Sequence, residues 1–241
     1  MSDTSVRLAV LRARAAEAAT RASRPALSVT VLGIAKRIPA ARVADAVRAG
    51  LTDVGENYLQ EALERRLELA KQLADEHVPQ PRWHFVGRIQ RNKARPIAQH
   101  FDVVHTLDRA SLGDALERHA AAAERRLDVL IQVNTSGESQ KGGVPPEAVD
   151  ALADAARGWP HLRLVGLMTL PAAFDDPERA RPAFRMLRAL RDRLEPRHPG
   201  LVELSMGMSG DFEVAIDEGA TIIRVGTALF GPRDADAAGG G

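Results

Sequence analysis

The feature that most constrains this chain is a regular alternation of short apolar runs with longer amphipathic stretches. Eight segments have strand character, namely 28–35, 53–55, 83–86, 103–106, 129–134, 163–168, 202–205 and 221–225. Strands that alternate with helices form right-handed βαβ units, and eight such units in 241 residues favour a closed barrel over an open sheet. We therefore predict an α/β fold, a single (β/α)8 TIM-type barrel.

The helical patterns between these runs complete the expected architecture. An additional N-terminal helix is predicted over 6–23, and other helices over about 39–49 and over 209–219. The apolar face of the first helix consists of Leu8, Leu11, Ala15 and Ala18. A second helical face is predicted from Leu59, Leu63, Leu67 and Ala70. We expect residues 1–233 to form one domain and residues 234–241 to be a disordered tail.

Composition excludes several classes of function. The chain has no cysteine, which removes disulfides, thiolate catalysis and Cys-ligated zinc, and no His or carboxylate cluster has the spacing of metal ligands. No apolar run is long enough for a membrane helix, and the N-terminus does not resemble a secretory signal. With a net charge of +1, no overall field favours nucleic acid or a membrane surface. We expect a cytoplasmic monomer.

Catalytic and binding groups of such barrels lie at the C-terminal ends of the strands, so the residues that follow each strand are the candidates. Lys36 directly follows the first apolar run, and only four lysines stand among 33 basic residues. An apolar setting favours the neutral amine, the form that attacks an aldehyde to give an imine. The alternative is a lysine that extends to solvent from the strand end.

The last two strands end in loops that suit a phosphate group. Residues 205–211 (SMGMSGD) and 224–228 (RVGTA) combine glycines, which let backbone N–H groups approach an anion, with hydroxyl side chains. Ordinary turn glycines are the alternative. Arg224 has two possible roles, as a second phosphate ligand or as a cation beside a heteroaromatic nitrogen or a carboxylate.

Other polar residues near strand ends carry weaker signals. Asn57 either caps a helix or contacts a ring substituent. The long polar loop 134–143 is either functional or mobile. His84 is interpreted as a hydrogen-bonded core histidine, and the basic segment 88–95, without interleaved aromatic residues, as a solvated helix face rather than a nucleic-acid patch.

An imine-forming lysine, a phosphate site and an arginine at one barrel mouth suit a phosphorylated aldehyde, above all pyridoxal 5′-phosphate. The competing interpretations at this point are a sugar-phosphate aldolase with a Schiff-base lysine and a barrel with a scaffold role.

The sequence resembles the pyridoxal phosphate homeostasis proteins of the YggS and PROSC type from about residue 6 to residue 232. The matching segments are GIAK at 33–36, GENYLQE at 55–61, WHFVGRIQRNK at 83–93, QVNTSGE at 132–138 with Lys141, GLMT at 166–169, LSMGMSGDFE at 204–213 and RVGTALFG at 224–231. This family is similar to the barrel domain of fold-type III enzymes such as alanine racemase, without their second domain.

The resemblance implies a role for each matching residue. Lys36 would bind the cofactor covalently, Arg224 would face the pyridine nitrogen, and Asn57 would contact the ring. The phosphate would be held by Ser205 and Thr227 together with the backbone of Met206, Gly207 and Gly226. The sequence departs from the family beside the lysine, where a Val-Ser-Lys-Thr type of run is replaced by residues 34–37 (IAKR). A hydroxyl is lost on each side of Lys36.

The function implied by the resemblance is a carrier or buffer of pyridoxal phosphate that supports amino-acid balance without catalytic turnover, with PLP-dependent apoenzymes as possible recipients. An arginine at the pyridine nitrogen disfavours its protonation, and an unprotonated ring is a poor electron sink. Tyr58 is the only tyrosine, with no evident reason to face the ring opposite Lys36. The first alternative is a small amino-acid racemase, and the second is an aldolase.

Overall fold

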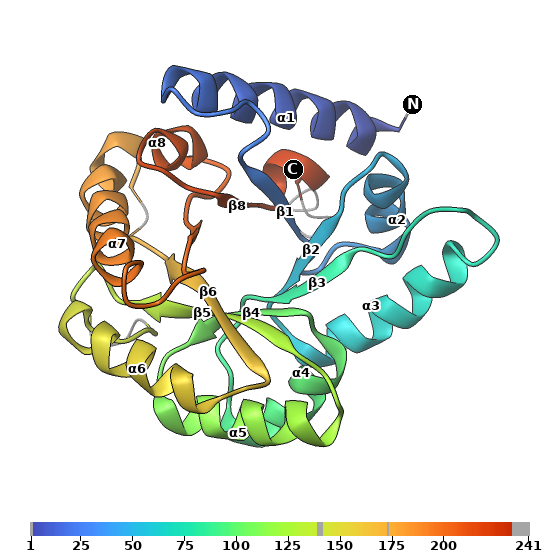
Figure 1. Cartoon of the computed structure of the whole chain (residues 1–241). Coiled ribbons are helices and arrows are strands. Elements are labelled where there is room, and N and C mark those ends of the chain that lie inside the picture. The colour runs from blue at the N-terminus through green and yellow to red at the C-terminus, as the bar shows by residue number, and fades with distance from the viewer. Residues whose placement is uncertain (1, 139–141, 173, 233–241) are drawn as a thin grey trace.

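The computed structural model describes residues 2–138, 142–172 and 174–232, which form a closed barrel of eight parallel strands (Figure 1). The strands are β1 (Thr30–Ile34), β2 (Asp53–Glu56), β3 (Arg82–Phe85), β4 (Val103–Leu107), β5 (Leu127–Val133), β6 (Leu162–Thr169), β7 (Glu203–Ser205) and β8 (Ile222–Val225). They pair in chain order, and β8 pairs with β1 to close the barrel. The predicted TIM-type fold is confirmed, and every expected strand end lies within two residues of the observed one.

Helices surround the strands (Figure 1). The α-helices are α1 (Asp3–Arg21), α2 (Ala40–Arg48), α3 (Leu59–Gln72), α4 (Ala94–His100), α5 (Ala110–Ala122), α6 (Val149–Ala155), α7 (Arg181–Leu194), α8 (Phe212–Asp217) and α9 (Thr227–Phe230). Short 3-10 turns are η1 (Arg91–Lys93), η2 (Pro146–Ala148), η3 (Ala156–Gly158) and η4 (Pro177–Ala180). Across the described part of the chain, no helix combines the length and apolarity needed to cross a membrane. The predicted tail 234–241 lies outside the described residues.

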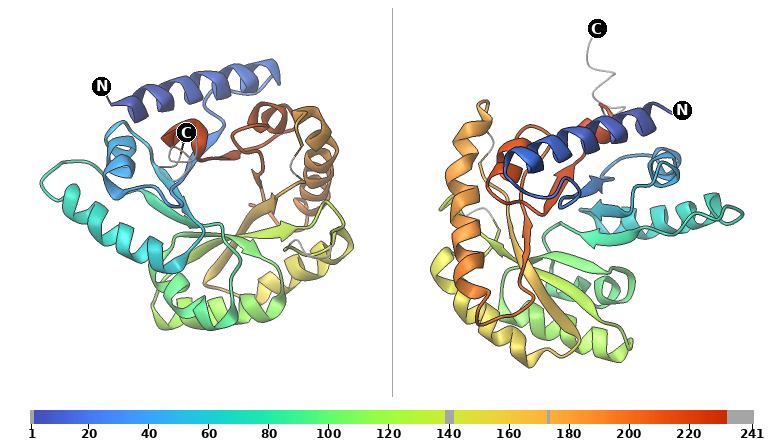
Figure 2. Two further views of the ribbon diagram at one scale, coloured as in Figure 1. Left: turned by 180° about the vertical axis from the view of Figure 1, so that it is seen from behind. Right: turned by 45° about the horizontal axis from the view of Figure 1, so that its top comes forward.

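The additional helix α1 lies outside the ring, beside α8 and α2 (Figure 2). Ser2 caps it by accepting a hydrogen bond from the Ser5 N–H. The four residues of its predicted apolar face are all buried. The eighth unit supplies only the four-residue α9, and α1 contacts both α8 and α9. The N-terminal helix therefore completes the outer layer where the eighth helix is too short to do so.

Two predicted helix details are wrong. On α3, Leu67 is 66% exposed and Ala70 is exposed, whereas Ala62 and Leu69 are buried. Each step of four residues turns about 40° beyond a full helical turn, so the predicted stripe drifts off the buried face. The helix expected over 209–219 is the shorter α8, because the Asp211 carboxylate accepts the Met208 N–H at 2.6 Å and holds the preceding residues in a turn.

Side chains of the strands alternate between the barrel interior and the helix layer. The outward-facing residues Val54, Val104, Leu204 and Ile223 belong to the main apolar core between strands and helices. Their neighbours Asp53, His105, Ser205 and Arg224 therefore point inward, and all four are buried. Two small apolar clusters are separate from the main core, Leu32 with Val86 and Ile222, and Val103 with Leu130 and Met168. The interior thus combines apolar clusters with a buried polar chain.

Candidate functional site

A cavity of about 340 Å³ opens at the C-terminal ends of the strands, the end of the barrel where such folds place their binding groups. Its volume is in the range of small-molecule sites. It is lined by Ile34, Asn57, Val86, Leu170, Met208, Ser209, Gly210, Arg224, Gly226 and Thr227. Residues from the first and last strands therefore share one cavity with the loop that follows β7. Four of the residues predicted to bind a cofactor, Asn57, Arg224, Gly226 and Thr227, are brought together here.

Arg224 provides a buried positive charge at the cavity. Its side chain donates one hydrogen bond to Ser205 Oγ at 2.7 Å and another to the Thr169 carbonyl at 2.7 Å. Burial lowers the pKa of Arg224 to about 10, although Asp211 opposes this shift. The guanidinium remains cationic at neutral pH, and two of its five N–H donors are already directed to protein acceptors.

The structure does not bring Ser205, Met206 and Gly207 to the cavity. All three are buried, and the Ser205 hydroxyl contacts His105 Nδ1 at 2.9 Å as well as Arg224. Gly207 has a φ of +90°, and a Cβ there would lie 2.6 Å from the Ala215 Cβ, so its role is to form the turn. Ser209, four residues after Ser205, supplies the hydroxyl of this loop that lines the cavity.

The opposite wall comes from the start of α9. Gly226 precedes the helix, and a Cβ at this position would meet nothing closer than the Ile34 carbonyl at 3.7 Å. Thr227 is the first helical residue, so its N–H has no acceptor within the helix. The Ala228 N–H donates to Ser209 Oγ at 3.4 Å and thereby links the two loops. The two loops therefore place the hydroxyls of Ser209 and Thr227 and the first turn of α9 around the open space beside Gly226.

Lys36 stands beside the cavity rather than among its lining residues. It follows Ile34 by two residues, is half-buried, and its ammonium lies 5.1 Å from the centroid of the Tyr58 ring. No hydrogen bond or ion pair to Lys36 is found among the described residues. The next residue, Arg37, has a φ of +57°, an unusual conformation for a residue with a side chain. Lys36 therefore lies close in sequence to the cavity lining, and no carboxylate in the described part of the chain pairs with it.

Asn57 does not cap the following helix. The N-cap position of α3 is Tyr58, and no side chain caps this helix. Asn57 instead lines the cavity, and its carbonyl oxygen would lie 2.1 Å from a Cβ at Gly87. The close approach of Gly87 thus fixes the backbone of Asn57 at the mouth of the barrel.

A buried ion pair lies behind the mouth, between β2 and α3. Arg65 Nε donates to Glu56 Oε1 at 2.6 Å, while Glu56 Oε2 is buried without a hydrogen-bond partner. Burial raises the pKa of Glu56 to about 7, despite the opposing effect of Arg65. Sequence reasoning missed Glu56, because a carboxylate directly before a turn gives no sign that a helix will cover it.

A larger groove of about 1220 Å³ opens between α3 and the loop after β3. It shares Asn57 with the cavity, and its other charged residues include Arg88, Lys93 and Glu64. The basic segment 88–95 is exposed at each of its four cations, as expected of a solvated face. We assign the candidate site to the smaller cavity, because the buried cation and the glycine-containing loops converge there.

His84 is a hydrogen-bonded core histidine, as predicted, with Asp53 and His105 as its partners. His105 was not singled out from the sequence, although a histidine inside the apolar run of β4 was an available signal. Within the described ranges, no group of three or more His, Asp or Glu side chains is arranged to hold a metal ion. Lys141 lies outside those ranges.

Comparison with known sequences assigns the chain to a protein family. The family model of the alanine racemase N-terminal domain matches residues 6–234. The pyridoxal phosphate homeostasis protein of Pseudomonas aeruginosa is 47% identical over 97% of this chain and 97% of its own length. The chain belongs to the pyridoxal phosphate homeostasis protein family. Its relative of the same name from Escherichia coli is 39% identical over 97% of this chain and 98% of its own.

Solved structures agree with this assignment. PipY of Synechococcus elongatus, in a structure with PLP bound, is 33% identical and has a TM-score of 0.79, covering 95% of this chain and 100% of its own. Alanine racemase of Corynebacterium glutamicum is 18% identical, with a TM-score of 0.62 over 93% of this chain and 62% of the racemase. The likeness to the racemase shows a shared barrel fold and nothing beyond it.

Proposed function

We propose that this protein binds pyridoxal 5′-phosphate at the barrel mouth and carries or buffers it, supporting the cell's supply of the cofactor. The single observation that carries the proposal is the convergence of Arg224, Gly226, Thr227 and Ser209 on one cavity of about 340 Å³. A cationic donor, two hydroxyls and an uncrowded glycine match an anionic, heteroaromatic ligand of that size. The PLP bound to PipY supports the same assignment.

The residues around the cavity divide into three roles. Thr227, Ser209 and the backbone at Gly226 hold the phosphate, because they provide hydroxyl and N–H donors. The space beside Gly226 is open, and a side chain at this position would occupy the space proposed for the phosphate. Arg224 faces the pyridine nitrogen, and Asn57 contacts the ring. Ser205, Met206 and Gly207 support this loop from behind, since they are buried and Ser205 is hydrogen-bonded to Arg224.

Lys36 holds the cofactor covalently in this proposal. Bound pyridoxal phosphate supplies an aldehyde with which a lysine amine can condense, with the loss of one water. Lys36 follows the lining residue Ile34 by two positions, and its ammonium lies 5.1 Å from the ring of Tyr58, the neighbour in sequence of the lining residue Asn57. No carboxylate among the described residues pairs with its amine. The hydroxyls missing at Ala35 and Arg37 leave Lys36 without adjacent hydrogen-bonding side chains of that kind.

Borohydride reduction of the loaded protein, followed by peptide mapping, tests the covalent site. We expect label on Lys36 and loss of the visible absorbance of the bound cofactor in Lys36→Ala. The matched control is Lys71→Ala, because Lys71 lies in the last turn of α3 and away from the cavity lining. Label on Lys71, Lys93 or Lys141 with Lys36 unmodified would refute the assignment. Absence of any PLP binding would refute the proposed function as a whole.

We further propose that the loaded protein does not turn over amino acids. Racemisation needs an acid and a base on opposite faces of the cofactor. The only tyrosine, Tyr58, stands with its ring 5.1 Å from the Lys36 ammonium, which favours a position on the same side as Lys36. A cationic Arg224 also disfavours protonation of the pyridine nitrogen and weakens the ring as an electron sink.

Exchange of the α-deuteron of labelled alanine, followed with chiral chromatography, tests this point. We expect no steady turnover. Turnover that disappears in Lys36→Ala would instead establish a small racemase. PLP-dependent apoenzymes are the proposed recipients of the cofactor, and transfer to a purified apoenzyme, measured as recovered activity, tests that role.

A further inference from the structure

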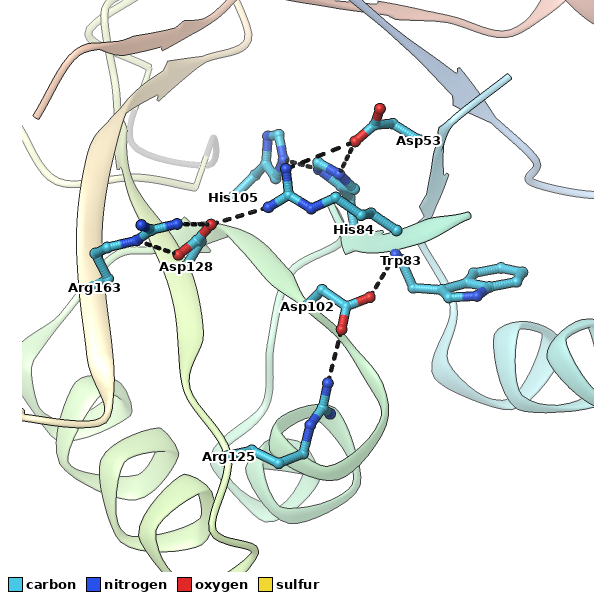
Figure 3. A network of polar contacts seen from close by, with 9 residues as sticks. Asp53, Trp83, His84, Asp102, His105, Arg125, Asp128 and Arg163 are labelled. Atoms are coloured by element: carbon cyan, nitrogen blue, oxygen red, sulfur yellow. Dashed lines mark hydrogen bonds and ion pairs between the residues drawn. The ribbon is translucent and has the colours of Figure 1, made fainter. Parts of the chain in front are cut away.

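A continuous chain of buried polar side chains runs through the barrel interior from Arg224 to the opposite end. Arg224 contacts Ser205 Oγ at 2.7 Å, Ser205 Oγ contacts His105 Nδ1 at 2.9 Å, and His105 Nε2 contacts His84 Nδ1 at 2.8 Å. His84 Nε2 contacts Asp53 Oδ1 at 2.9 Å. Figure 3 shows the end of this chain formed by Asp53, His84 and His105. All five residues are buried, with exposures from 0% to 6%.

When both histidines are neutral, the chemistry of the two ends determines the direction of every hydrogen bond between them. An arginine only donates, and an ionised carboxylate only accepts. Burial alone would raise the pKa of Asp53, but hydrogen bonds from His84 and Thr52 outweigh it and hold the pKa below its usual range. Asp53 is therefore ionised at neutral pH. A neutral His84 must donate to it through Nε2, which leaves His84 Nδ1 as an acceptor.

The same reasoning fixes the remaining members. His105 donates through Nε2 to His84, so its Nδ1 accepts from the Ser205 hydroxyl, and Ser205 Oγ accepts from Arg224. Burial, followed by the positive charges that His84, Arg224 and Arg82 can carry, lowers the pKa of His105 well below its usual value, which keeps that ring neutral. One proton then occupies each of the four contacts, and no donor faces a donor.

We propose that Asp53, His84 and His105 are positioning residues that act through Ser205 to hold Arg224 in one orientation at the cofactor cavity. The effect of this arrangement on the ring of a bound cofactor rests on the proposed function. Ser205 and the Thr169 carbonyl fix two donors of the guanidinium, and its remaining N–H groups stay available to the cavity that Arg224 lines. None of the three residues lines the cavity, so none is expected to touch the ligand.

The first test uses the protein without cofactor. Nitrogen-15 NMR of the histidine side chains reports which ring nitrogen carries the proton. We expect His84 and His105 both to be neutral and protonated at Nε2. An Nδ1–H tautomer or an imidazolium at either residue would overturn the directed chain, whatever the protein binds. This measurement separates failure of the chain from failure of the proposed function.

The second test compares variants with the loaded protein. His105→Phe removes the acceptor for Ser205 and the donor to His84, and we expect about tenfold weaker PLP binding. We also expect the pH midpoint of the cofactor's visible absorbance to shift by about half a pH unit or more, because the charge beside the ring is no longer fixed. His105→Gln keeps one acceptor and one donor and should restore both values.

His198→Gln is the matched control, because His198 is also buried but contacts Asp154 rather than any member of this chain. It should change neither the affinity nor the pH midpoint. If His105→Phe does not fold, the comparison of His105→Gln with Asp53→Leu replaces it, since Asp53→Leu removes the terminal acceptor. A wild-type pH midpoint in every one of these two variants that folds, His105→Phe or Asp53→Leu, would refute the positioning role.

Discussion

Two serines four residues apart, Ser205 at the end of β7 and Ser209 in the loop that follows it, should respond to substitution in opposite ways. Ser209 lines the cavity, whereas Ser205 is fully buried between His105 and Arg224. In the proposed binding mode, Ser209→Ala removes a hydrogen bond to a charged phosphate, which is worth about 1.5–3 kcal/mol. We therefore expect PLP to bind roughly 10- to 150-fold more weakly. Pyridoxal, which lacks the phosphate, should lose little affinity, and the unfolding temperature should change little because Ser209 is only half-buried.

Ser205→Ala should instead destabilise the protein without cofactor. The change leaves one Arg224 donor and one His105 acceptor buried without a partner, at about 1–3 kcal/mol each. For a chain of this size, that lowers the unfolding temperature by at least about 4 °C. PLP and pyridoxal should weaken together, so their affinity ratio stays near the wild-type value.

Calorimetric titration with both aldehydes and thermal unfolding of the apo-proteins measure these effects. The reasoning would be refuted if Ser205→Ala abolished the preference for PLP over pyridoxal while Ser209→Ala preserved it. That result would return the phosphate to Ser205, where the sequence pattern first placed it.

Three further predictions concern single residues near the mouth. Burial raises the pKa of Glu56 to about 7, so its ionisation removes roughly 1–3 kcal/mol of stability as pH rises from about 4.5 to about 7. Urea unfolding should show this loss in the wild type and not in Glu56→Gln. The same dependence of the unfolding free energy on pH in both proteins would contradict the prediction. Gly87→Ala should lower stability by about 1–3 kcal/mol, since its Cβ would lie 2.1 Å from the Asn57 carbonyl oxygen; Gly158→Ala, with nothing within 4 Å, is the control. Gly226→Ala should fold normally yet bind PLP more weakly, and unchanged affinity would exclude close approach of the phosphate there.

The sequence predicted the barrel well because the signals are local and repeated. Each strand is a short apolar run, and each run is followed by a helical pattern, so the strand ends are read directly from the residues. The buried faces of the helices were predicted less well than the strands. Leu67 fits a four-residue repeat but is exposed, because Arg65 occupies the buried face of α3 and pairs with Glu56. Nothing in the local pattern identifies a buried arginine whose partner lies on another element.

The candidate site was predicted in part. Asn57, Arg224, Gly226 and Thr227 line one cavity because each lies within two residues of a strand end, and strand ends meet at the barrel mouth. The sequence does not show that Ser209 rather than Ser205 lines the cavity, since both serines belong to the short segment 205–211 at the end of the seventh strand. What separates them is the inward direction of the last residue of β7 and the presence of His105, 100 positions away. Such long-range contacts leave no periodic trace.

The candidate cavity straddles the seam at which β8 closes on β1, with Ile34 on one side and Arg224, Gly226 and Thr227 on the other. During synthesis from the N-terminus, Ile34 emerges early, but the opposite wall is among the last described parts of the chain to be made. The cavity therefore does not exist until the two ends of the barrel meet. A ligand bound there contacts both ends at once, so it selectively stabilises the closed ring and slows the separation of β8 from β1. Occupancy of the cavity would thus protect the newly closed barrel from proteolysis.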